Sequence, residues 1–294
     1  MSLIINKNLL SVNKLISEGI EIKGNFNSCN SEAIRILIVN LMPKKSEAEF
    51  QFLNILGHMP IDIKVDFLQM ETYTPQNTDK TYLEEYYKTL RDIENNSYEG
   101  MIITGTPLEF LDFDDIEYWN ELKEVIDYSN KKVKSTLYIC WAAIAGLYYN
   151  YGTNKCVTKE KIFGVFPHIV VNKRSVLLKG FNDGFIVPHS RYVKLRKEDI
   201  EEIKELEILS ESDEAGIYIV SSKDGKQIYI TGHPEYDKYT LKEEYERDIK
   251  RGVNINLPKN YFPNDDHNKK PNLDWSSYSK LLFTNWINEY LFNS

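Results

Sequence analysis

Cysteine is scarce in this 294-residue chain, in which only Cys29, Cys140 and Cys156 occur. Three cysteines at such spacings exclude a disulfide-stabilised scaffold and a metal site built on paired cysteines, and they favour a reducing compartment. The sequence also lacks any run of about 18 apolar residues, which a membrane-spanning helix needs. We therefore expect neither a bound metal nor a membrane partner.

Positively charged residues are also fewer than negatively charged ones: the chain has 36 Lys and Arg residues and 44 Asp and Glu residues, so its net charge is −8. Basic residues form only short clusters such as Lys44-Lys45 and Lys131-Lys132, whereas a nucleic-acid-binding protein usually presents a basic face. The apolar patch at residues 3–5 is too short for the core of a signal peptide. These observations predict a cytoplasmic protein without a nucleic-acid partner.

The rest of the composition is that of a globular protein. Hydrophobic residues make up 42% of the chain and charged residues 27%, a balance that argues against disorder. No internal repeat is present, and no linker clearly separates two domains. We predict one domain over residues 1–294, with an N-terminal arm (1–33), an α/β core (34–252) and a C-terminal loop and helix (253–294).

Strand-like and helix-like segments alternate from residue 34 onward. Four short apolar runs predict buried strands, at residues 36–39, 61–68, 101–104 and 136–139. Three segments with apolar residues at helical spacing predict helices, at residues 46–56, 82–93 and 115–128. We interpret residues 46–49 as a capping box that opens the first of them. This alternation predicts a doubly wound α/β fold with a parallel sheet, in which ligands bind beyond the carboxyl ends of the strands.

The second half of the chain has a different pattern, which predicts additional short antiparallel strands. These are expected at residues 169–171, 176–178 and 185–187, followed by a hairpin at 216–220 and 227–231. Further helices are expected at residues 240–250, with Gly252 ending the helix, and at residues 275–292. Residues 253–274, rich in Pro, Asn and Asp, are expected to form an ordered loop or a crossing arm.

Cys140 is the strongest candidate for a functional residue. It ends a strand-like run, and small and apolar residues typical of a helix follow it at once. Backbone N–H groups and the dipole at a helix N-terminus favour a thiolate, and they can bind an oxyanion formed beside the sulfur. The loops at residues 40–45 and 105–107 follow other predicted strands and should meet Cys140 at the same sheet edge. A buried structural cysteine is the alternative.

A thiol nucleophile needs a base and a group that orients the base. His233 follows a predicted strand, and Glu235 stands two residues later, where it can reach the imidazole. Cys140, His233 and Glu235 would form a catalytic triad in that chain order. The alternative for His233 is a turn residue paired with a surface glutamate.

Four further residues could line the same site. Arg247 could clamp a substrate carboxylate, although Glu244, three residues before it, offers an ordinary intrahelical ion pair. Ser190 and Arg191 could line a pocket, and Lys161 could donate to an anionic group. A solvated surface role is the alternative for each of them.

Several long motifs resemble those of the homoserine O-acyltransferases of the methionine pathway. They stand in the family's order at residues 38–45, 104–108, 138–141, 188–192, 206–210, 231–237, 260–263 and 282–286. The resemblance implies a flavodoxin-like fold related to class I glutamine amidotransferases, and usually a homodimer. It further implies acyl transfer from acyl-CoA to a hydroxy amino acid by a ping-pong mechanism. Acyl-CoA would be a co-substrate, and no bound cofactor is implied.

The resemblance also implies roles for individual residues. Cys140 would carry the acyl group as a thioester, His233 would be the general base, and Glu235 would hold His233. The backbone N–H of Trp141 and the loop containing Leu41 would form the oxyanion hole.

Other positions match residues that contact substrates in the family. Arg247 would bind the carboxylate of the acceptor. Lys161 and Ser190 match substrate-contacting positions, and Glu244 matches an acidic residue near the site.

Glu109 bears on the identity of the acyl donor. After the motif Thr-Gly-x-Pro-x, family members that use succinyl-CoA tend to have Gly and those that use acetyl-CoA tend to have Glu. A carboxylate fills space and repels the free carboxylate of a succinyl group, whereas neutral acetyl is unaffected. We therefore expect acetyl-CoA as the donor, with Ser190 as a second residue that influences donor choice.

The chain departs from the family pattern at Ala142, Pro167, Ser276 and Tyr278, where the family usually has Gly, Glu, Arg and His. These departures leave the acceptor open between homoserine, serine and another hydroxy amino acid. Three further hypotheses stay open: succinyl-CoA as donor, hydrolysis of glutamine as in the amidotransferases, and a non-catalytic binding protein on the same fold.

Overall fold

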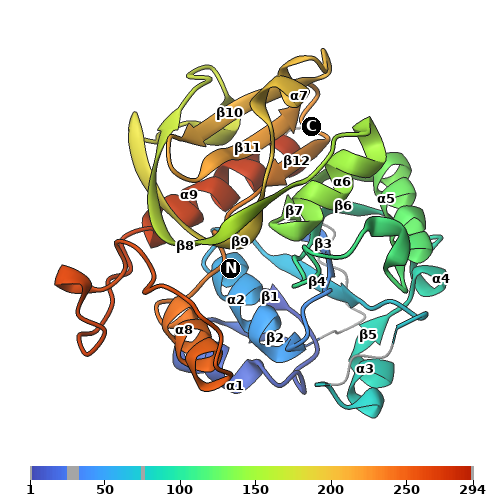
Figure 1. Cartoon of the computed structure of the whole chain (residues 1–294). Helices are drawn as coiled ribbons and strands as arrows, with labels where there is room; N and C mark the ends of the chain where they lie inside the picture. The colour runs from blue at the N-terminus through green and yellow to red at the C-terminus, as the bar shows by residue number, and fades with distance from the viewer. Residues whose placement is uncertain (1, 25–32, 74–76, 293–294) are drawn as a thin grey trace.

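The computed structural model describes residues 2–24, 33–73 and 77–292 (Figure 1). Its strands are β1 (Leu3–Ile4), β2 (Ile22–Lys23), β3 (Ile34–Val39), β4 (Ile63–Leu68), β5 (Tyr87–Lys88), β6 (Tyr98–Ile103), β7 (Val133–Ile139), β8 (Cys156–Val170), β9 (Gly184–Lys194), β10 (Leu206–Ser212), β11 (Gly216–Ser222) and β12 (Gln227–Ile230). They form one continuous sheet in the order β2-β1-β4-β3-β6-β7-β12-β11-β10-β8-β9, and β5 pairs with β4.

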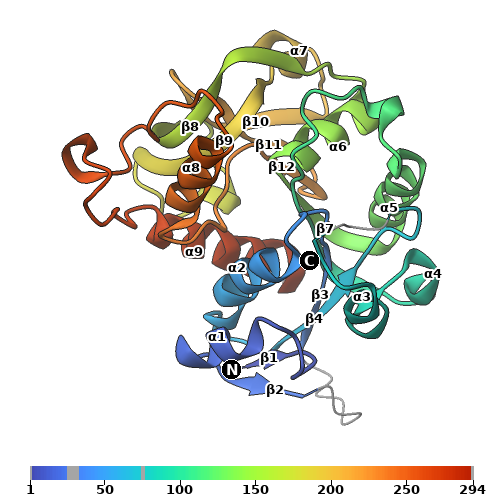
Figure 2. The ribbon, with the colours of Figure 1, turned by 60° about the horizontal axis from the view of Figure 1, so that its bottom comes forward.

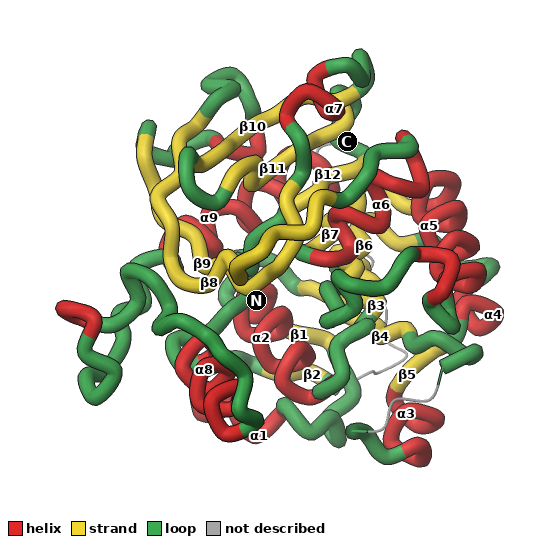
Figure 3. The backbone as a smooth tube through the Cα atoms, in the orientation of Figure 1, coloured by secondary structure: helices red, strands yellow, loops and turns green. Residues whose placement is uncertain are grey.

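The sheet has a parallel half and an antiparallel half. All neighbours from β2 to β12 along this order are parallel, and every pair from β12 to β9 is antiparallel. In Figure 3 the antiparallel β8, β9, β10 and β11 occupy the upper part of the molecule, and β3 and β4 the lower part. The predicted doubly wound α/β fold with added antiparallel strands is confirmed.

Helices cover both faces of the sheet. They are α1 (Val12–Ser17), α2 (Lys45–Gly57), α3 (Lys80–Tyr86), α4 (Leu90–Ile93), α5 (Trp119–Lys132), α6 (Trp141–Tyr151), α7 (Lys197–Glu201), α8 (Thr240–Lys250) and α9 (Ser276–Trp286). Short 3-10 turns are η1 (Phe113–Asp115), η2 (Val176–Leu178) and η3 (Pro263–Asp265), and α9 continues as a π-helical turn, η4 (Ile287–Phe292). No helix of the described residues is long and apolar enough to cross a membrane.

The two faces bury separate cores because side chains alternate along each strand. On β3, Ile36 and Ile38 pack with α1, α2 and α9, whereas Leu37 and Val39 pack with α5 and α6. Figure 2 shows α2 and α9 side by side, away from α5. The two cores hold the parallel strands between them, and ligands of such sheets bind beyond the carboxyl ends of the strands.

Two expectations about the first half are wrong. The single helix expected at residues 82–93 is divided, because Tyr87 pairs with Phe67 of β4 and a capping box of Thr89 and Asp92 starts α4 afresh. The capping box expected at residues 46–49 is absent: α2 starts at Lys45, and the buried Glu49 carboxylate accepts hydrogen bonds from Tyr82 and Tyr87 instead.

The second half also differs in detail. The strand expected at residues 176–178 is η2, and those expected at 169–171 and 185–187 overlap the ends of the long hairpin strands β8 and β9. In the predicted N-terminal arm, β1 and β2 extend the sheet instead of lying on it. Cys29 lies outside the described residues.

The predicted crossing arm reaches β8 at Gly164. The Lys259 backbone donates to Phe163 O (3.0 Å) and accepts from Val165 N (2.8 Å). A Cβ at Gly164, whose φ is +139°, would lie 2.3 Å from Lys259 O. Only glycine permits this approach, so Gly164 allows residues 253–260 to lie beside β8.

Candidate active site

Cys140 occupies a strained corner between β7 and α6. Its φ of 52° and ψ of −113° are unusual for a residue with a side chain. The corner is held because Cys140 N donates to Ile230 O (2.7 Å) and Ala143 N donates to Cys140 O (3.0 Å). Such strain at a strand-to-helix turn is typical of nucleophile elbows. The side chain therefore stands at the N-terminus of α6.

His233 and Glu235 lie beside this corner, as the sequence predicted. Their side chains join through a 2.6 Å contact between His233 Nδ1 and Glu235 Oε1, and both residues are buried, with 4% and 7% exposed. Tyr236 stacks on the imidazole at 4.0 Å and 13°. Since Nδ1 is occupied by Glu235, Nε2 is the nitrogen left for chemistry.

The imidazole also has Cys140 within hydrogen-bonding reach. Burial lowers the pKa of His233, but the charges and hydrogen bonds of Cys140 and Glu235 outweigh burial and hold this pKa well above its usual range. The arrangement stabilises an imidazolium beside the Cys140 sulfur, and a neighbouring imidazolium is what activates a cysteine nucleophile.

The predicted substrate-binding residues meet in one cluster of charges. Glu244 Oε1 accepts from Lys161 Nζ (2.6 Å) and from Ser190 Oγ (2.8 Å). Arg247 donates through Nε to Asp248 Oδ1 (2.8 Å), and Asp248 Oδ2 lies 3.5 Å from Lys161 Nζ. The cluster joins β8, β9 and α8, which are far apart in the sequence, and its cations lie where they could bind an anionic group.

Arg247 also forms part of the intrahelical ion pair that its spacing suggested. Its Nη2 lies 3.4 Å from Glu244 Oε1 within α8, yet 43% of its side chain is exposed. The guanidinium therefore keeps N–H groups that a ligand can reach. Asp248, which joins Arg247 to Lys161, was missed in the sequence. Its position one residue after Arg247 gave no signal, because a helix normally points adjacent side chains in different directions.

Glu109, in the loop between β6 and η1, interacts electrostatically with both groups of residues. Burial raises the pKa of its carboxyl group, and its own backbone N–H and the charges of Lys161 and His233 offset this effect only in part. The charge of Glu244 raises the pKa further. The Glu109 carboxyl group is thus influenced both by His233 and by the charged cluster.

The two residues expected to form the oxyanion hole differ in their availability. Trp141 N begins α6 next to Cys140, where a helix N-terminus offers free donors. The N–H of Leu41, in contrast, donates to Thr104 Oγ1 (2.8 Å), so it is not available to an oxyanion. Gly105 lies beside Cys140, since a Cβ built on it would be 3.2 Å from Cys140 Cβ and 3.6 Å from Trp141 N.

Arg191, a candidate for lining a pocket, is instead a structural residue. It is fully buried and donates to the carbonyl oxygens of Thr231, Val193 and Ala215. Burial lowers the pKa of its guanidinium to about 10, and the charge of Cys140 opposes this effect. These bonds join β9 to the end of β12 just before His233.

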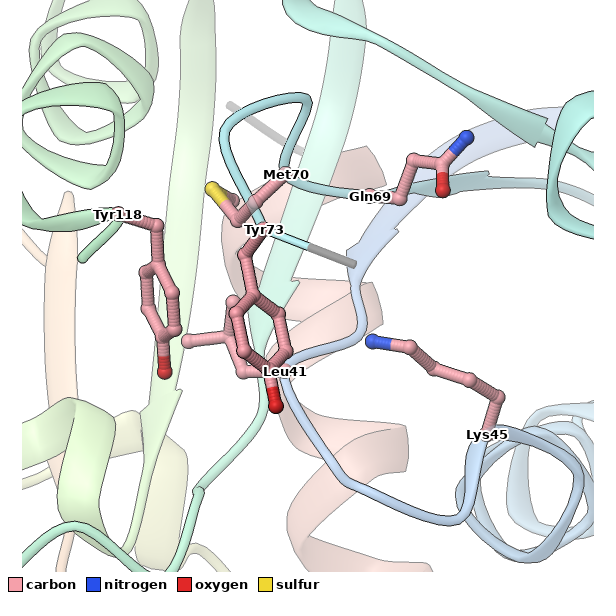
Figure 4. A pocket seen from close by; sticks show the side chains of 6 residues that line it. All are labelled: Leu41, Lys45, Gln69, Met70, Tyr73 and Tyr118. Atoms are coloured by element: carbon pink, nitrogen blue, oxygen red, sulfur yellow. The ribbon is translucent and has the colours of Figure 1, made fainter. Parts of the chain in front are cut away.

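Lys45 borders a small cavity at the ends of β3 and β4 (Figure 4). The cavity has a volume of about 10 Å³ and is lined by Leu41, Lys45, Gln69, Met70, Tyr73 and Tyr118, which leaves space for about one water molecule. The Lys45 ammonium donates to Asn40 O, and burial lowers its pKa to about 8 against the opposing charge of Glu49. The cavity is too small for a substrate. Among the described residues, no three His, Cys, Asp or Glu side chains are placed to hold a metal ion.

Solved structures that resemble this chain share its fold. A glutamine amidotransferase from Thermotoga maritima is 14% identical with a TM-score of 0.57, and the match covers 88% of this chain and 99% of that one. A second, from Methylobacillus flagellatus, is 12% identical with a TM-score of 0.56, and the match covers 88% and 95%. The class I amidotransferase-like fold is thereby confirmed.

Sequence relatives are much more similar. A protein named homoserine O-acetyltransferase from Petrotoga mobilis is 51% identical over 259 residues, which cover 88% of this chain and 84% of the relative. Proteins of the same name from Bacillus cereus (strain ATCC 10987 / NRS 248) and Clostridium tetani are 46% and 47% identical, and each match covers 99% of this chain, with 98% and 97% of the relatives. The family model described as homoserine O-succinyltransferase matches residues 2–294. The chain belongs to this family of acyltransferases.

Proposed function

We propose that this protein is a homoserine O-acetyltransferase, which transfers the acetyl group of acetyl-CoA to the hydroxyl of L-homoserine and so serves methionine biosynthesis. The observation that carries the proposal is the buried Cys140–His233–Glu235 arrangement beside a cluster of cations and carboxylates. The names of the relatives agree with this reaction.

In the first half-reaction, the Cys140 thiolate attacks the carbonyl carbon of the acetyl thioester. The oxyanion that forms lies next to Trp141 N–H at the start of α6, with the Gly105 turn as the neighbouring backbone. Collapse of this intermediate breaks the bond to the CoA sulfur. The departing thiolate takes the proton of the His233 imidazolium, and the acetyl group remains on Cys140.

In the second half-reaction, neutral His233 removes the proton from the acceptor hydroxyl as the oxygen attacks the acetyl group on Cys140. The ester leaves, and the thiolate and imidazolium are restored. Glu235 holds Nδ1 of His233 throughout, so that Nε2 faces the reacting atoms. A buried site protects the thioester from water between the two steps.

The charged cluster suits the amino-acid end of the acceptor. Arg247 has exposed N–H groups that can bind a carboxylate in bidentate fashion, and Glu244 can accept from an ammonium group. In this proposal Glu109 borders the acyl chain, and its carboxylate repels the free carboxylate of a succinyl group. This argument selects acetyl-CoA over succinyl-CoA.

Two departures from the family pattern, Ser276 and Tyr278, lie near the C-terminus, and Tyr278 serves packing. The Tyr278 hydroxyl accepts from Asn182 (2.9 Å), and its ring packs on Phe181 and Phe185. Its neighbour Ser276 starts α9. These contacts of Tyr278 do not include the charged cluster, so this departure gives no argument against homoserine as acceptor.

The proposal can be tested by measuring the mass of the intact protein after incubation with acetyl-CoA or succinyl-CoA. We expect one acetyl group on Cys140 from acetyl-CoA alone, and its discharge by homoserine but not by serine. The variant Cys140→Ala should take up no acetyl group. The absence of an adduct in the unsubstituted protein, or an adduct that survives in Cys140→Ala, would contradict the thioester mechanism. Ammonia release from glutamine would instead favour the amidotransferase reaction.

A further inference from the structure

A groove lies between the β8–β9 hairpin and the crossing arm that Gly164 holds in place. Its volume is about 970 Å³, at the upper end of the range for pockets that bind small molecules and cofactors. Lys159, Lys161 and Tyr192 line it from the hairpin, and Ile255, Leu257 and Lys259 line it from the arm. A homoserine molecule would fill only a small part of such a space.

The groove adjoins the proposed chemistry at Lys161. This residue lines the groove, and its Nζ lies 2.6 Å from Glu244 Oε1 in the charged cluster. The charges of Lys161 and His233 both lower the pKa of the Glu109 carboxyl group, which relates the groove residue Lys161 and the catalytic pair to the same side chain. The groove thus adjoins the charged cluster through Lys161.

The walls combine apolar side chains with charged ones, namely four lysines and the carboxylates of Glu160, Glu214 and Asp265. Phe163, Ile255 and Leu257 supply an apolar wall. Next to the groove, the Phe110 side chain is 64% exposed, and its ring lies 5.0 Å from that of Tyr192. An exposed aromatic ring beside a groove is a surface on which a chain of methylene and methyl groups, or a flat base, can pack.

The lysines of the groove differ in how far they are already paired. Lys194 donates to Glu214 O (2.8 Å), and Lys259 pairs with the Glu214 carboxylate. Lys159 is exposed and lines the groove, and it forms no ion pair or hydrogen bond with any residue that the structure describes. Its ammonium group is therefore free to bind an external anion such as a phosphate.

We propose that this groove binds the pantetheine arm and phosphate groups of the CoA donor, with the acyl end directed past Lys161 and Glu109 to Cys140. The apolar wall fits the methylene and methyl groups of pantetheine, and Lys159 fits a phosphate. The proposal rests on acyl-CoA being the donor in the proposed function. The cavity at Lys45 offers only about 10 Å³ and cannot hold the same group.

Two substitutions in the groove test this site. Lys159→Glu reverses the free charge, and Asn256→Trp fills the groove from the crossing arm, where Asn256 is exposed and lines it. Lys223→Glu and His267→Trp are matched controls at exposed positions outside the lining. The dissociation constant of free CoA is measured by calorimetry for each protein. Thermal unfolding of each variant checks that it is folded.

The same proteins are then compared with two acetyl donors, acetyl-CoA and the acetyl thioester of N-acetylcysteamine, which lacks the nucleotide and phosphates. We expect Lys159→Glu to weaken CoA binding about tenfold. Asn256→Trp should weaken it at least as much. In both variants, kcat/KM for acetyl-CoA should fall relative to kcat/KM for the small thioester. The controls should keep the ratio of the unsubstituted protein.

The outcomes separate this proposal from the proposed function. If the unsubstituted protein is acetylated but neither groove variant weakens CoA binding more than its control, the groove is not the CoA site, and the thioester mechanism stands. If neither donor acetylates the unsubstituted protein, the proposed function fails, and the groove proposal fails with it.

Discussion

The parallel and antiparallel halves of the sheet contribute to the site in different ways. The parallel half places Cys140 at a corner fixed by one hydrogen bond to β12 and one from α6, and neighbouring parallel strands bring their loops to that corner. The antiparallel half supplies Lys161 and Ser190 from the long β8–β9 hairpin, and α8 adds Glu244 and Arg247. In the proposed function, the parallel half therefore activates the nucleophile, and the antiparallel half with α8 recognises the substrates.

The largest loss of activity should come from replacing Cys140, the nucleophile that the parallel half positions. In Cys140→Ala, the formation of the acetyl-enzyme should be abolished and the overall transfer rate should fall at least about a thousandfold. The control is Cys156→Ala, a half-exposed cysteine on β8, which should keep near-normal activity. Rates are measured by the release of free CoA thiol. Equal losses in the two variants would contradict the role of Cys140.

The next effect should follow from Glu235→Gln, which keeps the shape of the side chain but removes its charge. We expect kcat to fall by about 10²- to 10³-fold, because the imidazolium loses its stabilising partner and Nδ1–H loses its strongest acceptor. Glu246→Gln, at a position on α8, is the control. A loss confined to KM would be inconsistent with an orienting role for Glu235.

Arg247→Lys tests the recognition half. The loss of bidentate binding should raise KM for homoserine by about 10- to 100-fold. The rate of acetylation by acetyl-CoA, followed by rapid-quench mass measurements, should change much less than the homoserine step. Arg251→Lys, at the C-terminal end of the same helix, should resemble the unsubstituted protein. An equal fall in the rates of both half-reactions would mean that the parallel and antiparallel halves of the sheet do not have separate functions.

The substitution Glu109→Gly tests whether this residue determines the choice of acyl donor. Removal of the carboxylate should shift the ratio of kcat/KM for succinyl-CoA to that for acetyl-CoA by at least about tenfold towards succinyl-CoA, because like charges no longer meet. Glu109→Gln, which keeps the volume, separates charge from space. Glu117→Gly, at an exposed position nearby, should leave the ratio unchanged.

The smallest effect concerns the titration of His233. Cys140 and Glu235 raise its pKa against the effect of burial, so Cys140→Ala should move the imidazole titration to lower pH, as followed by NMR. Since the folded pKa is raised, the contribution of His233 to stability is complete below its unfolded pKa of roughly 6.5 and is lost as pH rises through the folded value. In Cys140→Ala this loss should be smaller and should be complete at lower pH, because the folded pKa lies nearer the unfolded one, as measured by urea unfolding. An unchanged titration would show that the sulfur does not influence the imidazole.

Much of the parallel half could be predicted from sequence because its signals are local. Cys140 stands between an apolar run and a helical one, and His233 and Glu235 stand two residues apart after a strand. Local patterns failed where contacts distant in the sequence decided the structure. Tyr87 interrupts an expected helix because it pairs with β4. Glu49 does not cap its helix as expected, because its buried carboxylate accepts a hydrogen bond from Tyr87.

The sequence by itself determined the doubly wound order of elements, the corner that carries Cys140 and the partner that follows His233, since each depends on neighbours within a few residues. Only the tertiary structure decided that Leu41 gives its N–H to Thr104, that Asp248 joins Arg247 to Lys161, and that a groove opens beside β8. These features depend on segments brought together across the sheet, and burial or Coulomb energy between them leaves no pattern in the sequence around any one residue.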